Sequence, residues 1–286
     1  MDRAPSAVPC FVGSPLTAAV FLTLLLATAP VRWQALDEAG RAQALAELQP
    51  LPLPEKLLAA SARFLGTPYG FSPLGEGAGF DADPRLRWDK VDCVTFVEES
   101  MALSLARRPE DVLPLLDAIR YRDGTVAYQA RNHLMEADWL PANARAGFVR
   151  DVTFALGGAD AVQADKRLSE RSWEGKEAQA LALPASARAI GTFPFGLLPV
   201  QRVLAHAAGF PSGTVLLVVR EDGPQRITRV SHLGLVVQKG GQTYLRHATS
   251  VGVKAVVDEE LGHFLSRQSQ LAWKLLGVSL WEVRTR

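Results

Sequence analysis

The sequence is poor in cysteine and carries almost no net charge. Only Cys10 and Cys93 are cysteines among its 286 residues, and the formal net charge at neutral pH is +1. Cys10 lies in the extreme N-terminal segment, so a mature chain without that segment holds Cys93 alone and no internal disulfide. A net charge so close to zero provides no overall field to attract DNA or RNA, so no nucleic-acid partner is predicted.

Several common enzyme motifs are also missing. The sequence has no G-x-S-x-G elbow, no phosphate-binding loop, no dinucleotide fingerprint between a strand and a helix, and no internal repeat. These absences argue against a serine hydrolase of the elbow type and against nucleotide-dependent enzymes, and no cofactor is predicted. The composition, with 48% hydrophobic and 21% charged residues, is that of a globular chain that can bury a core.

The N-terminal segment resembles an export signal. The run from Leu16 to Ala29 is nearly all apolar, whereas a membrane span needs about 20 residues. Cleavage could follow Ala29, although Pro30 is a poor next residue, or Ala35. We therefore predict that residues 1–35 are a signal peptide or an uncleaved anchor, that the protein is periplasmic or secreted, and that residues 36–286 form a single domain.

The periodicity of the remaining chain predicts a mixture of helices and strands. Helices are expected over 36–48, 55–65, 94–107 and from 109 to about 122, with a loop rich in Gly and Pro at 66–77. Loops, short helices and an edge strand are expected between 151 and 199. Strands are expected at 214–219, with a return at 226–230, and then at 231–237 and 243–248.

Cys93 stands where a polar loop becomes an apolar helix. Asp92 is a good N-cap residue, which places Cys93 at the positive end of the helix, where a thiol pKa can be lowered. The alternative is that Cys93 is simply a small apolar residue at the top of a core helix.

Two histidines converge on the predicted C-terminal hairpin. If Gly240 and Gly241 form its turn, Val236 lies opposite Leu245, and His232 and His247 become diagonal neighbours on one face, roughly 7–8 Å apart between Cα atoms. A cysteine nucleophile needs a base and a group that orients the base, so Cys93, His232 and His247 could supply all three.

Other interpretations of these residues remain open. Each histidine could be a structural residue, His133 is a competing base, and one cysteine with two histidines could bind zinc. The zinc interpretation is weaker because no two of these ligands are closely spaced on one element.

An ordered set of motifs resembles the N-acetylmuramoyl-L-alanine amidase-like family of the NlpC-type, papain-like cell-wall hydrolases. The motifs are Gly66-Thr67-Pro68-Tyr69, Pro73-Leu74-Gly75-Glu76-Gly77, Asp92-Cys93-Val94-Thr95-Phe96-Val97-Glu98, Arg131-Asn132-His133 with Asp138-Trp139, Ser231-His232-Leu233-Gly234 and Arg246-His247-Ala248. The resemblance extends from about Leu57 to about Phe264.

The resemblance implies an α+β, papain-like fold, in which a central helix carrying the cysteine packs on an antiparallel β-sheet, with extra N-terminal helices. It also implies a peptidoglycan or muropeptide substrate, and we expect a monomer. Cys93 would be the nucleophile, His232 the base and His247 the orienting residue. The motif residues Tyr69, Glu76, Arg131, Asn132 and His133 are expected to contact substrate, and no metal is expected.

The chain departs from the family pattern in two places. Ser212-Gly213-Thr214 stands where many relatives have Gly-Asp, and Val94 stands where Thr or Ser is common. Neither change removes a catalytic group. The alternatives to an amidase are a stem-peptide endopeptidase, an acyltransferase that uses the same thiolate, and a non-catalytic cell-wall binding module.

Overall fold

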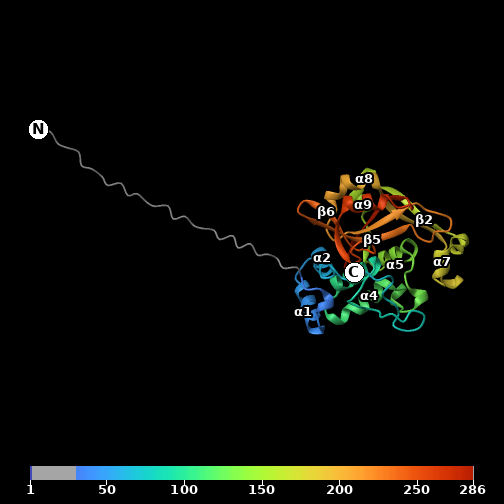
Figure 1. Cartoon of the computed structure of the whole chain (residues 1–286), viewed down its shortest axis with the longest axis horizontal. Helices are drawn as coiled ribbons and strands as arrows, with labels where there is room; N and C mark the ends of the chain where they lie inside the picture. The colour runs from blue at the N-terminus through green and yellow to red at the C-terminus, as the bar shows by residue number, and fades with distance from the viewer. Residues whose placement is uncertain (2–29, 286) are drawn as a thin grey trace.

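The structure is a computed structural model that describes residue 1 and residues 30–285. The predicted apolar leader at 16–29 therefore lies outside the described residues. The described chain is an α+β fold in which helices flank a sheet whose strand pairs are all antiparallel (Figure 1). Within these residues no helix is long and apolar enough to span a membrane.

The helical elements are short, and the three longest, α1, α2 and α3, lie in the N-terminal half. The α-helices are α1 (Glu38–Leu48), α2 (Leu53–Ala62), α3 (Cys93–Leu105), α4 (Val112–Arg120), α5 (Leu140–Arg145), α6 (Thr153–Gly157), α7 (Lys176–Ala180), α8 (Val200–His206) and α9 (Leu261–Ser269). A π-helix, η5, covers Met135–Trp139. The 3₁₀ segments are η1 (Trp33–Ala35), η2 (Pro109–Asp111), η3 (Arg122–Gly124), η4 (Tyr128–Ala130), η6 (Gly158–Asp160), η7 (Glu170–Glu174), η8 (Ala185–Ala187) and η9 (Ala207–Gly209).

The sheet has the strand order β2-β3-β8-β4-β5-β6-β7, and β1 pairs with β8. The strands are β1 (Val149–Asp151), β2 (Val162–Leu168), β3 (Gly191–Pro199), β4 (Val215–Arg220), β5 (Val230–Lys239), β6 (Gln242–Ala248), β7 (Val256–Glu260) and β8 (Leu275–Val283). Strand β4 is buried along its whole length, which explains its continuous apolar run.

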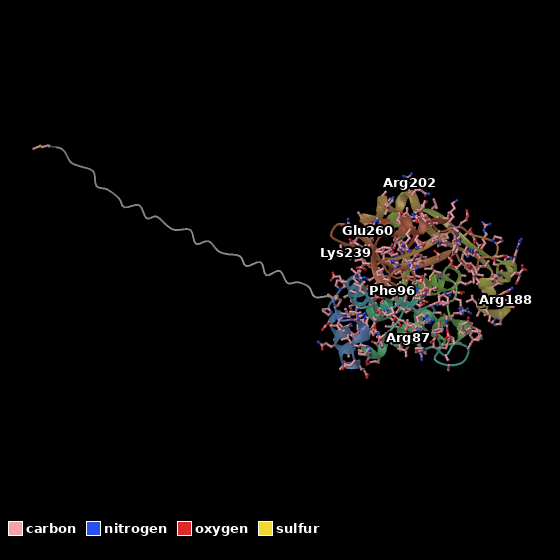
Figure 2. The ribbon with its side chains drawn as sticks, in the orientation of Figure 1. Arg87, Phe96, Arg188, Arg202, Lys239 and Glu260 are labelled. Atoms are coloured by element: carbon pink, nitrogen blue, oxygen red, sulfur yellow. The ribbon has the colours of Figure 1, made fainter. Side chains whose placement is uncertain are left out.

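Alternate side chains of the sheet face two different cores. On one face Leu217 and Leu233 pack with Phe96 and Val97 of α3, and on the other Leu216 and Val236 pack with Phe264 of α9. Figure 1 shows α8 and α9 on one side of the sheet and α2, α4 and α5 on the other. Figure 2 shows Phe96 near the middle of the molecule, with labelled charged side chains such as Arg202 at its periphery.

The C-terminal hairpin forms with the predicted register. Gly240 and Gly241 have φ values of +58° and +75°, as a primed turn requires, and Val236 pairs with Leu245. The predicted helices over 36–48, 55–65, 94–107 and 109–122 correspond to α1, α2, α3 and η2 with α4, with small shifts of their ends.

Other segments differ from the prediction. Residues 162–199 hold a long hairpin, β2 with β3, where mostly loops and short helices were expected. The return strand expected at 226–230 does not form, because β5 begins only at Val230. Strands β7 and β8 and helix α9 were not predicted; β7 carries three acidic residues, which are uncommon in strands.

Candidate functional site

Cys93 is the first residue of α3, as its capping sequence predicts. The Asp92 carboxylate accepts a hydrogen bond from the Thr95 N–H at 2.8 Å, and the Thr95 hydroxyl accepts one from the Asp92 N–H at 2.9 Å. This reciprocal capping box fixes the first turn of the helix and with it the position of the thiol.

The thiol pKa is raised rather than lowered, which corrects the prediction from the helix start. Burial of the thiol and the nearby Asp92 charge raise the pKa of Cys93 to about 12. The backbone N–H groups of Leu233, Cys93 and Val94 point to the sulfur and act in the opposite direction, but they are outweighed. At neutral pH the resting group is therefore a thiol.

The Cys93 thiol lies next to the end of the hydrogen-bonded ladder between β5 and β6. The β5–β6 ladder ends at the pair Leu235 and Arg246, so the N–H of Leu233 lies beyond the last pair and is directed to the sulfur of Cys93. Leu233 follows His232 directly. The contact therefore joins Cys93 to the backbone of the residue next to His232. Within the described residues, no direct hydrogen bond joins the Cys93 sulfur to the His232 ring.

His232 and His247 form a hydrogen-bonded pair on the α9 face of the sheet. Nε2 of His232 lies 2.8 Å from Nδ1 of His247, with the rings nearly perpendicular. Phe264 of α9 packs against both rings, at 5.7 Å and 5.1 Å between centroids. The predicted diagonal approach of the two histidines is thus present in the structure.

Both histidines are held neutral by their surroundings. Burial, together with the charges of His247, Arg267 and Arg220, lowers the pKa of His232 well below 6.5. Burial also lowers the pKa of His247 to about 4, although Glu259 partly opposes this. A neutral imidazole can accept a proton.

Glu259 and Arg267 extend this pair, and sequence reasoning missed both. Oε2 of Glu259, on β7, lies 3.1 Å from Nε2 of His247 and 2.6 Å from a guanidinium nitrogen of Arg267 on α9. The run Asp258-Glu259-Glu260 was the only signal in the sequence, and without a predicted strand there nothing connected it to His247.

Tyr69 lies beside the start of α3. Its backbone forms a bridge with Val91, and its N–H donates to the carbonyl of Lys254 at 2.7 Å. Burial and the neighbouring Cys93 and Asp92 raise the pKa of Tyr69 to about 12. The phenol therefore remains a hydrogen-bond donor at neutral pH.

The predicted substrate residues of the 131–133 motif are engaged within the protein. Arg131 forms ion pairs with Glu76 at 2.6 Å and with Asp81 at 2.8 Å. The Asn132 amide donates to the carbonyl of Ile119, and His133 donates from Nε2 to the carbonyl of Tyr128 at 2.7 Å. These contacts tie the 76–81 loop to the 128–139 segment, and substrate contact by these residues stays a prediction.

His133 is the competing base of the sequence analysis. Burial lowers its pKa to about 4, and its ring packs against that of Tyr128 at 4.7 Å between centroids. His232, in contrast, lies on the strand whose Leu233 N–H is directed to the Cys93 thiol.

A buried carboxylate fixes the start of β5. Glu136, in the π-helix η5, accepts hydrogen bonds from the N–H groups of Arg229 at 2.6 Å and Val230 at 3.1 Å, and from the Thr228 hydroxyl at 2.8 Å. The strand that carries His232 therefore begins at a fixed point.

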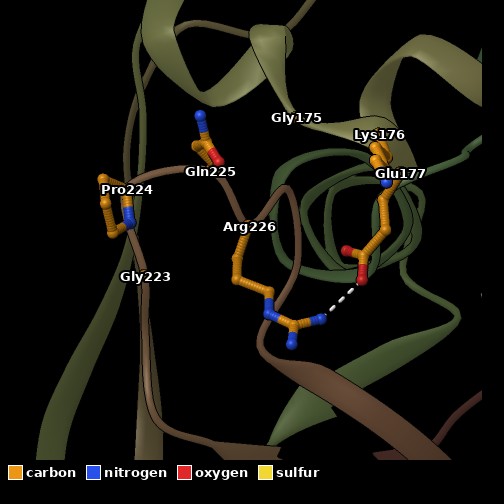
Figure 3. A pocket seen from close by; sticks show the side chains of 7 residues that line it. All are labelled: Gly175, Lys176, Glu177, Gly223, Pro224, Gln225 and Arg226. Atoms are coloured by element: carbon orange, nitrogen blue, oxygen red, sulfur yellow. Dashed lines mark hydrogen bonds and ion pairs between the residues drawn. The ribbon is translucent and has the colours of Figure 1, made fainter.

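Neither a metal cluster nor the pocket in Figure 3 coincides with this site. In the part of the chain that the structure describes, no group of three or more His, Cys, Asp or Glu residues is placed to hold a metal ion. A surface pocket of about 460 Å³ lies between η7–α7 and the β4–β5 loop, where Glu177 and Arg226 form an ion pair (Figure 3). It contains none of the predicted site residues.

Solved structures share this fold. A protein of Legionella pneumophila strain Philadelphia 1 is similar with a TM-score of 0.76 and 24% identity, over 86% of this chain and 93% of that one. An N-acetylmuramoyl-L-alanine amidase from Bacteroides uniformis is similar with a TM-score of 0.66 and 24% identity, over 82% of this chain and 99% of that one. No curated protein sequence matches the chain.

The sequence itself matches one family model. The match covers residues 59–271, which include Cys93, His232 and His247 as well as Tyr69 and the 131–133 motif. The resemblance of the motifs to this amidase-like family is thereby confirmed. The chain belongs to the N-acetylmuramoyl-L-alanine amidase-like family, a family of peptidoglycan hydrolases.

Proposed function

We propose that the protein is a cysteine hydrolase with a papain-like fold that cleaves the amide bond between the lactyl group of muramic acid and L-alanine. The observations that support this proposal are the capped Cys93, whose thiol receives the N–H of Leu233, and the hydrogen bond between His247 and His232, the residue that precedes Leu233. The choice of this bond rests on the family.

The proposed reaction begins from a neutral thiol and a neutral imidazole. His232 accepts the Cys93 proton as the sulfur attacks the substrate carbonyl, because the pKa values disfavour a preformed ion pair. Hydrogen bonds between catalytic groups often form only in the substrate complex, and the proposed mechanism requires that substrate binding brings the Cys93 thiol into contact with the His232 ring.

Two donors are available for the developing oxyanion. The backbone N–H of Cys93 lies at the free N-terminus of α3, and the Tyr69 hydroxyl is kept protonated beside it. Protonated His232 then gives its proton to the leaving amine. Water attacks the thioester with His232 as base, which releases the acid and restores the thiol.

Digestion of purified sacculi tests this reaction. Wild-type protein should release sugar-free peptides that begin with L-alanine, as identified by mass spectrometry. Cys93→Ala should release none while keeping the unfolding temperature of the wild type. If Cys93→Ala still digests sacculi, the cysteine mechanism is wrong.

The same digest separates the alternatives. Fragments cut within the stem peptide would identify an endopeptidase of the same mechanism. Product joined to an added amine would identify an acyltransferase. Binding to sacculi without any released peptide would identify a binding module.

We also propose export to the periplasm or the cell exterior. Trp33 is fully buried and its indole donates to the carbonyl of Ala60 at 2.9 Å, so removal of residues 1–35 would take a core side chain from the domain. Cleavage after Ala29 would keep it. N-terminal sequencing of the exported protein distinguishes the two positions.

A further inference from the structure

A continuous chain of polar contacts runs from His232 to α9. Nε2 of His232 lies 2.8 Å from Nδ1 of His247, and Nε2 of His247 lies 3.1 Å from Oε2 of Glu259. Arg267 donates to both oxygens of Glu259, at 3.1 Å and 2.6 Å. Glu259 pairs with Leu245 in the β6–β7 ladder, which makes it a diagonal neighbour of His247.

The charge on Glu259 determines the direction of every hydrogen bond in this chain. Burial opposes its ionisation, but the hydrogen bond and charge of Arg267 hold the pKa of Glu259 below its usual value. An ionised carboxylate can only accept, so Nε2 of His247 must carry a hydrogen. In a neutral imidazole this leaves Nδ1 of His247 as an acceptor.

The hydrogen-bond direction at His247 also fixes which ring nitrogen of His232 carries a hydrogen. Because Nδ1 of His247 accepts, Nε2 of His232 must donate, and Nδ1 of the neutral His232 ring is then without a hydrogen. In the proposed mechanism this bare nitrogen accepts the Cys93 proton. The opposite arrangement would place a hydrogen on Nδ1 and leave the thiol without a base.

We propose that Glu259 is a positioning residue that acts through His247 to keep Nδ1 of His232 unprotonated as the base for Cys93. This inference rests on the proposed cysteine mechanism and adds a fourth residue, two contacts away from the base. Arg267 keeps Glu259 ionised, and Phe264 covers both rings with an apolar surface.

The charged groups around the two rings come from several elements. Arg220 on β4 and Arg267 on α9 act on His232, and Asp258 and Glu259 on β7 act with Arg267 on His247. Asp258 is itself engaged by Arg246 and Lys239. Glu259 is the carboxylate that contacts an imidazole directly, so its removal should have the specific effect.

Glu259→Gln tests the proposal with little change in shape. The amide nitrogen can donate to His247 Nε2, which reverses both histidines and places a hydrogen on Nδ1 of His232. Because general acid–base catalysis contributes about 10²–10⁴-fold, we expect kcat to fall by about 100-fold with KM within about twofold. The matched control is Glu260→Gln, at the neighbouring carboxylate, which caps α9 through Gly262 and His263. It should lower the unfolding temperature slightly and leave kcat unchanged.

A spectroscopic measurement keeps the test independent of the substrate. The ¹⁵N chemical shifts of labelled histidines distinguish protonated from bare ring nitrogens. In the wild type, Nδ1 of His232 should be bare and Nε2 of both rings protonated, and Glu259→Gln should change this pattern. Wild-type kcat and an unchanged pattern in Glu259→Gln would overturn the inference, even with Cys93→Ala inactive.

Failure of the proposed function has a different signature. Wild-type protein would then be inactive on sacculi, while the ¹⁵N pattern would still test the tautomers. If Glu259→Gln does not fold, Arg267→Met provides a second test. Loss of the guanidinium should raise the pKa of Glu259, so the ¹⁵N signal of a bare Nδ1 on His232 should be lost, as the pH falls, at a higher pH than in the wild type. A tautomer pattern that loses this signal at the same pH as the wild type would count against the proposal.

Discussion

Asp258→Asn is expected to destabilise the protein by about 3 kcal/mol, because it breaks a buried ion pair by removing one partner. Arg246 donates to Asp258 at 2.7 Å and 3.0 Å, and its remaining donors hold the carbonyl of Leu58 and the hydroxyl of Ser61 in α2. The guanidinium and the carboxylate are 7% and 10% exposed. This pair therefore joins β6, β7 and α2 in a largely dry environment.

The expected loss of stability follows from the hydrogen bonds of Asp258 that an asparagine can and cannot keep. Its carbonyl can take the place of Oδ2, which accepts from Lys239 and from one Arg246 nitrogen, but its amide nitrogen cannot accept the second bond from Arg246, whose charge then lacks a carboxylate partner. A hydrogen bond to a charged group contributes about 1.5–3 kcal/mol, and an uncompensated buried charge costs about 3–5 kcal/mol. Burial opposes ionisation of Asp258, yet Arg246 and Lys239 hold its pKa below the usual value, so the charged form stabilises the fold at neutral pH.

Urea denaturation at pH 7 measures this difference, and a loss of about 3 kcal/mol should lower the unfolding temperature by about 6–12 °C. The matched control is Glu110→Gln, which removes the carboxylate of a pair with Arg108 that is 62% and 67% exposed. An exposed pair of this kind should contribute less than about 1 kcal/mol. If Asp258→Asn and Glu110→Gln cost the same, the reasoning from burial is refuted.

The free energy of unfolding should also depend on pH, because the pKa of His247 differs between the folded and unfolded chain. Its pKa is about 4 in the fold and near 6.5 when exposed, so the unfolded chain binds more protons and stability is complete above pH 6.5 and lost as the pH falls towards 4. The stability lost between pH 6.5 and pH 4 is at most about 3 kcal/mol. Denaturation of His247→Gln at these two pH values should show a smaller loss of stability than the wild type. Asp92→Ala should cost about 1 kcal/mol as a lost N-cap and should lower the pKa of Cys93, which would appear as faster alkylation by iodoacetamide at pH 8; an unchanged rate would contradict the assigned role of the Asp92 charge. Gly234→Ala should cost about 1–3 kcal/mol, because a Cβ would lie 2.6 Å from the Arg246 carbonyl and 2.9 Å from Cβ of His247; a denaturation midpoint equal to that of the wild type would mean that β5 and β6 move apart freely there.

Much of the candidate site follows from short-range features of the sequence. Asp92 and Thr95 mark the start of α3, and Gly240-Gly241 sets the hairpin register that brings His232 and His247 together. Each feature depends on residues a few positions apart, so propensity and pairing rules suffice. The predicted roles of Cys93, His232 and His247 in catalysis remain predictions that the digest tests.

Other features depended on contacts between distant segments. Glu259 contacts His247 only because β7 pairs with β6 and α9 brings Arg267 to the same place. The ion pairs of Arg131 with Glu76 and Asp81 likewise join segments about fifty residues apart. Sequence patterns carry no signal for such partners, because each acidic or basic residue alone is equally compatible with an exposed surface.

The sequence by itself determined the helix that begins at Cys93, the register of the β5–β6 hairpin and the family. The tertiary structure decided the protonation of the site, because desolvation depends on what packs over a group. The helix start was expected to lower the thiol pKa, yet burial raises it to about 12, and burial also keeps His232 and His247 neutral. The protonation states of these side chains therefore depend on the packed core around Phe264 and Glu259, which no local sequence pattern could reveal.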